Sequence, residues 1–106
     1  MKLGIIISQT DPETVWNAFR FGNFSINKDH TVRTFLIGKG VECVEIVNKD
    51  FPVIDEINKY VQSEGEIFAC GTCLVSRNKE GSPICPMSNM NDLMELVEES
   101  DKVVSF

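Results

Sequence analysis

Short apolar runs rich in β-branched residues alternate along this chain with segments of helical periodicity, and this alternation limits the possible folds more than any other feature. The apolar runs lie at residues 3–8, 31–37, 66–69 and 102–106. Each has the length and composition of a strand, and the run at residues 3–8 is typical of a strand that is buried on both faces. Strands that alternate with helices pair in parallel through crossover connections. We therefore predict an α/β fold, a three-layer α/β/α sandwich with a mainly parallel sheet of about five strands.

The segments between the strands carry helix signals of different strength. Residues 11–14 (Asp-Pro-Glu-Thr) are typical of a helix start, with an acidic N-cap and a proline in the first turn. Apolar positions at helical spacing predict a second helix that ends near Gly65 and a last helix around residues 90–97. Residues 41–47 fit either a short helix or a strand. We expect a short helix at residues 72–78 and a loop at residues 79–88.

The size and charge of the chain exclude several classes of function. Its 106 residues predict a single domain, residues 1–106. The net charge is -6 and no basic cluster interrupts it, so we expect no direct nucleic-acid binding. No apolar stretch approaches the roughly 20 residues that cross a bilayer, and no signal peptide is recognisable, so we predict a cytoplasmic protein without membrane contact. Four cysteines in that reducing compartment favour catalytic, metal-bound or free thiols over disulfides.

Two cysteines stand where the third predicted strand ends. The apolar run at residues 66–69 is followed directly by Cys70, and Cys73 comes three residues later. The start of a helix favours thiolate over thiol, because it carries partial positive charge and unpaired N–H groups. Functional sites of parallel sheets lie outside the carboxyl ends of the strands. We therefore predict Cys70 as a nucleophile and Cys73 as a thiol able to resolve a persulfide or disulfide on it.

Arg77 lies seven residues after Cys70, two turns along the same helical face if the helix continues. It is a candidate to stabilise a thiolate, although a solvated charge without a role explains it equally well. His30 is the only histidine, and we expect it at the amino edge of the sheet, away from Cys70. Gly38-Lys39-Gly40 has no Walker or dinucleotide pattern around it, so we predict a turn and no bound cofactor.

Other roles compete for the cysteines. Cys70 and Cys73 could simply pack the junction between strand and helix. Their spacing also matches the thioredoxin-type motif, but that motif opens a long helix after an early strand. A zinc site needs three or four convergent ligands, and a second Cys-x-x-Cys pair is missing, so we expect no metal. The zinc alternative would combine these ligands: Cys70, Cys73 and Cys85, with Cys43 or His30.

Several segments together resemble the DsrE/DsrF-like family of small sulfur-relay and sulfur-reduction proteins, and the resemblance covers nearly the whole chain. The segments are residues 2–8, residues 11–13 with 16–18, residues 35–41, Ala69-Cys70-Gly71-Thr72-Cys73-Leu74 with Arg77, and residues 101–106. The resemblance implies a parallel α/β/α sandwich and assembly as a trimer or hexamer. It also implies that sulfur is carried as a persulfide on one cysteine, whose position matches Cys70. Cys73 lies outside the minimal family pattern, so a one-cysteine carrier and a two-cysteine reductase-like protein both stay open.

The leading hypothesis is a sulfur carrier or sulfurtransferase-like protein. Cys70 would accept sulfane sulfur as a persulfide and pass it to a partner thiol, with help from Cys73 and Arg77. Its partners would be sulfur-donor and sulfur-acceptor proteins, and we expect a homo-oligomer. The alternatives are a non-enzymatic oligomeric module that binds a ligand or protein, and a dithiol redox protein that uses Cys70 and Cys73.

Overall fold

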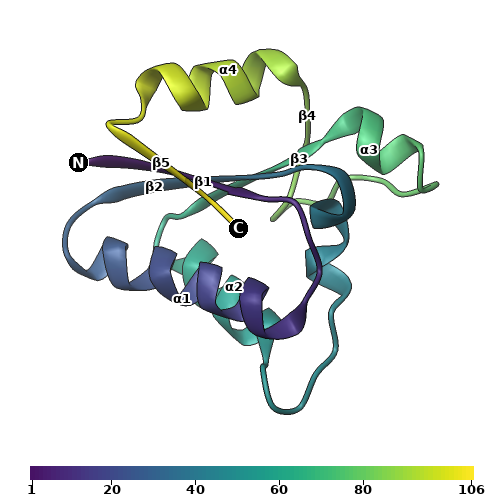
Figure 1. The fold of residues 1–106 in the computed structure, drawn as a ribbon, viewed down its shortest axis with the longest axis horizontal. Helices are drawn as coiled ribbons and strands as arrows, with labels where there is room; N and C mark the ends of the chain where they lie inside the picture. Colours follow the sequence, from purple (N-terminus) through teal and green to yellow (C-terminus); the bar gives the residue numbers. More distant parts are fainter.

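The computed structural model describes residues 1–106 and is built on one five-stranded sheet (Figure 1). Along the sheet the order is β4-β3-β2-β1-β5, and every pair of neighbours is parallel. The predicted α/β class with a parallel five-stranded sheet is therefore confirmed. The strands are β1 (Lys2–Ile7), β2 (Thr31–Leu36), β3 (Glu66–Cys70), β4 (Met87–Ser88) and β5 (Lys102–Ser105).

Helices cover both faces of this sheet. Figure 1 shows α1 and α2 together on one face and α4 alone on the other, while α3 follows the end of β3. This arrangement is the predicted three-layer sandwich. The helical elements are α1 (Pro12–Asn27), the 3-10 helix η1 (Gly38–Glu45), α2 (Val53–Gln62), α3 (Gly71–Val75) and α4 (Met90–Glu99).

Two of the helix starts are capped by local side chains. The Asp11 carboxylate accepts the Thr14 N–H at 3.0 Å, with Pro12 in the first turn of α1. The Asn89 side chain accepts the Asp92 N–H at 3.0 Å in the same way at α4. Each cap satisfies a backbone donor that has no partner inside the helix. The helix start predicted at residues 11–14 is confirmed.

Tyr60 connects α2 to the sheet and closes the core on that face. Its side chain is fully buried and packs edge-on against Phe19 of α1, with ring centroids 5.4 Å apart. Its hydroxyl lies 2.9 Å from Thr34 Oγ1 and donates to the Glu66 carbonyl at 3.2 Å. A buried hydroxyl needs such partners, so this network holds α2 in one position over β2 and β3.

The structure differs from the sequence prediction in the segment before α4. Residues 79–88 were expected to form a loop, but Met87 and Ser88 form β4, at the edge of the sheet beside β3. The Ala69 N–H donates to the Pro86 carbonyl at 3.0 Å and holds this strand in place. A strand of two residues has no periodicity of its own. Only its pairing with β3 defines it.

The ambiguous residues 41–47 fall largely in η1, which is helical and packs against the carboxyl edge of the sheet. Gly40 makes this close approach necessary, because a Cβ atom there would lie 2.0 Å from the Ile7 carbonyl oxygen. Any larger side chain would push η1 away from the end of β1. The 3-10 helix is thereby fixed beside the end of β3, where the two cysteines lie.

Candidate functional site

Cys70 is the last residue of β3 and lies at the carboxyl edge of the sheet. It pairs in register with Ser88 of β4, and only 2 % of its surface is exposed. Cys73 stands in α3, which begins directly after β3, and its side chain is only partly buried. Both cysteines therefore lie at the edge where parallel sheets usually carry their sites, as the sequence predicted.

The two thiols are in direct contact. The Sγ atoms of Cys73 and Cys70 are joined by a hydrogen bond of 2.8 Å. Cys73 Sγ also accepts the Gly38 N–H at 3.2 Å. Gly38 has a φ of +56°, in the left-handed region that favours glycine, and it begins η1. The end of β2 thus supplies a backbone donor to the more exposed of the two sulfurs.

Burial decides the acidity of Cys70. Its pKa is raised above the usual value, first because the side chain is desolvated and second because it is hydrogen-bonded to Cys73. The backbone N–H groups of Cys73 and Thr72 oppose this shift without reversing it. The sequence-based expectation that the helix start would favour a Cys70 thiolate is therefore wrong for the resting thiol pair. Desolvation destabilises the Cys70 thiolate by more free energy than the two backbone N–H groups stabilise it.

Arg77 reaches the backbone of the site but not its sulfurs. Its guanidinium donates to the Cys73 carbonyl at 3.1 Å and to the Ser76 hydroxyl at 3.3 Å, and it pairs with Glu42 of η1 at 3.6 Å. No hydrogen bond joins it to the sulfur atom of Cys70 or of Cys73. Lys79 forms a second ion pair with Glu45 of η1, at 2.7 Å. Together these pairs hold η1 against the segment that follows β3.

The other two cysteines lie in the protein interior. Burial and the nearby Cys85 raise the pKa of Cys43 to about 12, and burial raises that of Cys85 to about 11. Cys43 also donates to the Gln9 carbonyl at 3.4 Å. The prediction that Cys43 packs in an apolar environment is confirmed, since it is 1 % exposed. Neither thiol is arranged for reaction with a solute.

No three histidine, cysteine, aspartate or glutamate side chains converge as a metal site. His30 lies at the opposite, amino edge of the sheet, where its Nδ1 is 2.7 Å from the Met1 amino nitrogen. This is the position that the sequence predicted. The zinc ligand sets considered from the sequence are therefore not assembled.

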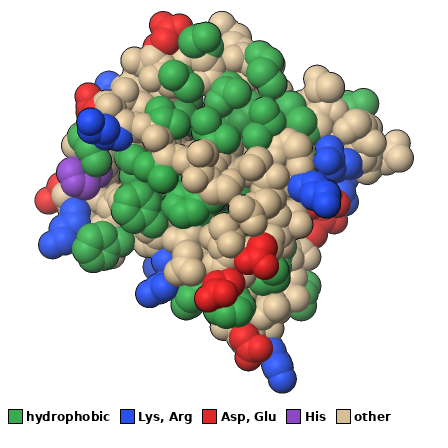
Figure 2. All heavy atoms as spheres, viewed as in Figure 1, with side chains coloured by type: hydrophobic (Ala, Val, Ile, Leu, Met, Phe, Trp, Pro, Cys, Tyr) green, Lys and Arg blue, Asp and Glu red, His purple; other side chains and the backbone are tan.

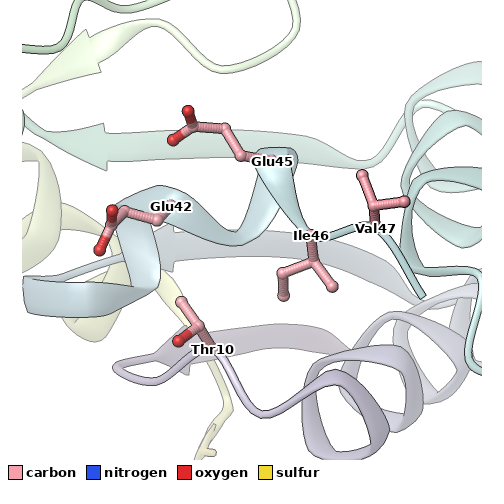
Figure 3. Close-up of a pocket in the computed structure, with 5 residues that line it drawn as sticks. All are labelled: Thr10, Glu42, Glu45, Ile46 and Val47. Carbon is pink, nitrogen blue, oxygen red and sulfur yellow. The ribbon is translucent and has the colours of Figure 1, made fainter.

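A surface hollow of about 380 Å³ lies beside η1. Figure 3 shows Glu42 and Glu45 projecting from η1, Thr10 facing them, and Ile46 and Val47 beyond the end of the helix. Both carboxylates are already paired with Arg77 and Lys79. The hollow therefore has no free charge to attract a cation.

Sequence reasoning missed two parts of the site. The sequence predicts the Gly38 turn at the same carboxyl edge as Cys70, but not the contact of its N–H with the Cys73 sulfur. Ser88 was placed in a loop, yet it lies beside Cys70 and donates to the carboxylate of Asp92. The predicted place of the Gly38 turn rests on its position directly after a strand, since the ends of neighbouring parallel strands meet at one edge.

The fold and the site define a class: a small parallel α/β protein with a dithiol at the carboxyl edge of its sheet. The chain belongs to the DsrE/DsrF-like family, whose model matches residues 1–106 and whose members are generally sulfur-relay proteins. The crystal structure of the YchN protein from E. coli has a similar fold, with a TM-score of 0.88 and 16 % sequence identity over 100 % of this chain and 99 % of that one. Comparison with curated proteins gives no significant match. None of the helices is long and apolar enough to span a membrane.

Proposed function

We propose that this protein is a sulfur carrier of the sulfurtransferase type, which accepts sulfane sulfur as a persulfide on Cys70 and passes it to a partner thiol. The observation that carries the proposal is the contact of two thiols, 2.8 Å apart, at the carboxyl edge of the sheet in a member of the DsrE/DsrF-like family. Cys43 and Cys85 are buried and have strongly raised pKa values, so the other thiols do not compete for this role.

The loading step is a thiol exchange. The Cys70 sulfur attacks the outer sulfur of a donor persulfide R–S–SH, forming Cys70–S–SH and releasing the donor thiolate R–S⁻. Because burial keeps Cys70 protonated at rest, its proton must leave as the new bond forms. It can pass to the departing R–S⁻, which then leaves as the thiol R–SH. The N–H groups of Thr72 and Cys73 favour the negative charge that develops on Cys70.

In this proposal Arg77 acts mainly by position. Its hydrogen bond to the Cys73 carbonyl and its pairing with Glu42 join α3 to η1, so the Gly38 donor stays in reach of Cys73. The role predicted for Arg77 from the sequence, direct stabilisation of the anion, stays a prediction.

The partners we propose are sulfur-donor and sulfur-acceptor proteins and further copies of this chain, as a trimer or hexamer. α4 presents three exposed apolar side chains at helical spacing: Met90, Met94 and Val97, with exposed fractions of 55 %, 56 % and 44 %. Figure 2 shows apolar side chains grouped over the upper part of the molecule, where α4 lies. Such a stripe is typical of an interface between proteins. Four free cysteines fit the reducing cytoplasm.

The test is uptake of sulfur by the purified protein. After brief treatment with glutathione persulfide and trapping by an alkylating reagent, we expect one additional sulfur atom on the Cys70 peptide or hydrosulfide released from it. Cys70→Ser should lose this uptake, whereas Cys85→Ala, which removes a thiol outside the pair, should keep it. Equal uptake or release of sulfur by Cys70→Ser and the wild type would refute the proposal. A wild type that neither takes up sulfur nor releases it as hydrosulfide would favour the alternative of a non-enzymatic binding module.

A further inference from the structure

We infer that Cys73 discharges the Cys70 persulfide within the same chain, so that the sulfane sulfur leaves as hydrosulfide and a Cys70–Cys73 disulfide remains. This inference rests on the proposed persulfide at Cys70 and goes beyond it. It makes the protein a two-electron reductase of low-molecular-weight persulfides and polysulfides, and transfer to a partner becomes a step that has to compete with the internal reaction.

The first argument is proximity. The two sulfurs are 2.8 Å apart before any chemistry takes place, so a persulfide on Cys70 forms with a second thiol already against its inner sulfur. No movement of the backbone is needed to bring the nucleophile to its target. A relay cysteine that only hands sulfur to another protein gains nothing from such a neighbour. The neighbour shortens the lifetime of the sulfur that it carries.

The second argument is the competition between the internal and the external thiol. A well-oriented intramolecular group reacts as if it were present at an effective concentration of about 10⁵ M or more. A thiol on a separate protein is present at a concentration many orders of magnitude lower. Even after a large discount for imperfect alignment, Cys73 therefore reacts before a freely diffusing partner. Transfer to a partner is faster than the internal reaction only where that partner is already bound and keeps Cys73 away from the Cys70 persulfide.

The third argument is the environment of Cys73. Its sulfur accepts the Gly38 N–H at 3.2 Å, which holds the side chain beside Cys70. The side chain is also less buried than Cys70. Cys73 is thus held in contact with its target and is open to solvent.

The atoms and electrons of the step balance. The Cys73 thiolate attacks the inner sulfur of Cys70–S–SH, the bond between the inner and outer sulfur breaks, and the outer sulfur leaves as HS⁻. The sulfane sulfur gains two electrons, and the two cysteine sulfurs lose them in forming the disulfide. A new cycle requires an external dithiol as reductant. That reductant would attack the Cys73 sulfur, because this is the accessible end of the disulfide.

The experiment follows a labelled sulfur atom. Glutathione persulfide with an isotopically labelled outer sulfur is mixed with the protein without oxygen or added reductant, and labelled hydrosulfide, protein-bound label and intact mass are followed over time. The wild type should release about one labelled hydrosulfide per chain and become lighter by two hydrogens, with the disulfide mapped to Cys70 and Cys73. Cys73→Ser and Cys73→Ala should hold the label on Cys70 at least about a hundredfold longer. Cys85→Ala should behave like the wild type.

The outcomes separate the two proposals. If the wild type keeps the label on Cys70 for as long as Cys73→Ser does, the internal discharge is refuted while the carrier function stands. If neither the wild type nor Cys73→Ser binds or releases label, the persulfide at Cys70 is refuted and the inference falls with it. Release of labelled hydrosulfide by Cys70→Ser at the wild-type rate would show that the release does not require a persulfide on Cys70, and it would refute the inference. Circular dichroism of each variant checks that it is folded.

Discussion

The interior thiols provide a sharp test of how burial controls the reactivity of this protein. The perturbation is exchange with an aromatic disulfide reagent at about pH 8, with each cysteine measured against its own rate in the unfolded chain. The pKa of Cys43 rises from 9.0 to about 12, a difference of three units. Its thiolate population therefore falls about 1,000-fold on folding. For Cys85 the change from 9.0 to about 11 gives about 100-fold.

The lower thiolate population is partly offset in the reaction rate, because a more basic thiolate is also a better nucleophile. With a Brønsted coefficient of about 0.45, three units return a factor of about 20 and two units a factor of about 8. We therefore expect Cys43 to react about 50-fold more slowly in the native than in the unfolded protein, and Cys85 about 12-fold more slowly. These factors are lower limits, because the surrounding side chains also block the reagent.

The assay quenches the exchange at intervals and quantifies each cysteine by peptide mass spectrometry. Cys73 serves as the internal comparison, since it is the most exposed of the four cysteines. The same chain in concentrated urea, where all four environments are lost, is the control. If Cys43 or Cys85 reacted in the native protein at the rate of the unfolded chain, the argument from burial would be wrong. The assignment of reactivity to the Cys70–Cys73 pair would lose its support.

Two further predictions concern stability and assembly. The raised pKa values of Cys43 and Cys85 mean that both thiols stay protonated in the folded state after the unfolded chain has begun to ionise. Their contribution to the free energy of unfolding is complete below about pH 9. It falls by about 1.4 kcal/mol per pH unit per thiol as the pH rises toward the pKa values of the folded state. Urea unfolding at stepped pH should show this decrease, and a free energy of unfolding that does not change with pH would contradict it. Met94→Glu puts a charge into the exposed stripe of α4 and should lower the oligomeric state in sedimentation velocity, whereas Asn91→Glu, at an exposed polar position of the same helix, should not. An unchanged assembly in Met94→Glu would exclude this stripe from the interface.

The parts of the fold that were predictable are those that local chemistry specifies. The β-branched runs, the Asp11 cap and the apolar spacing around Tyr60 each depend on neighbours within a few residues, and all three appear in the structure. β4 depends on a neighbour far away in the sequence. Met87 and Ser88 become a strand only because Ala69 and Cys70 lie beside them. Two residues carry too little pattern to show this in the sequence alone.

The same distinction between local and tertiary information applies to the site. The sequence determined that two cysteines follow a buried strand in a parallel α/β fold, because strand, helix and thiol spacing are all local properties. Only the tertiary structure decided how those thiols behave. It buries Cys70, leaves Cys73 partly exposed, and brings the Gly38 N–H to a sulfur 35 positions further along the chain. Acidity depends on desolvation and on donors from other strands, and both arise only when the ends of the strands meet at one edge.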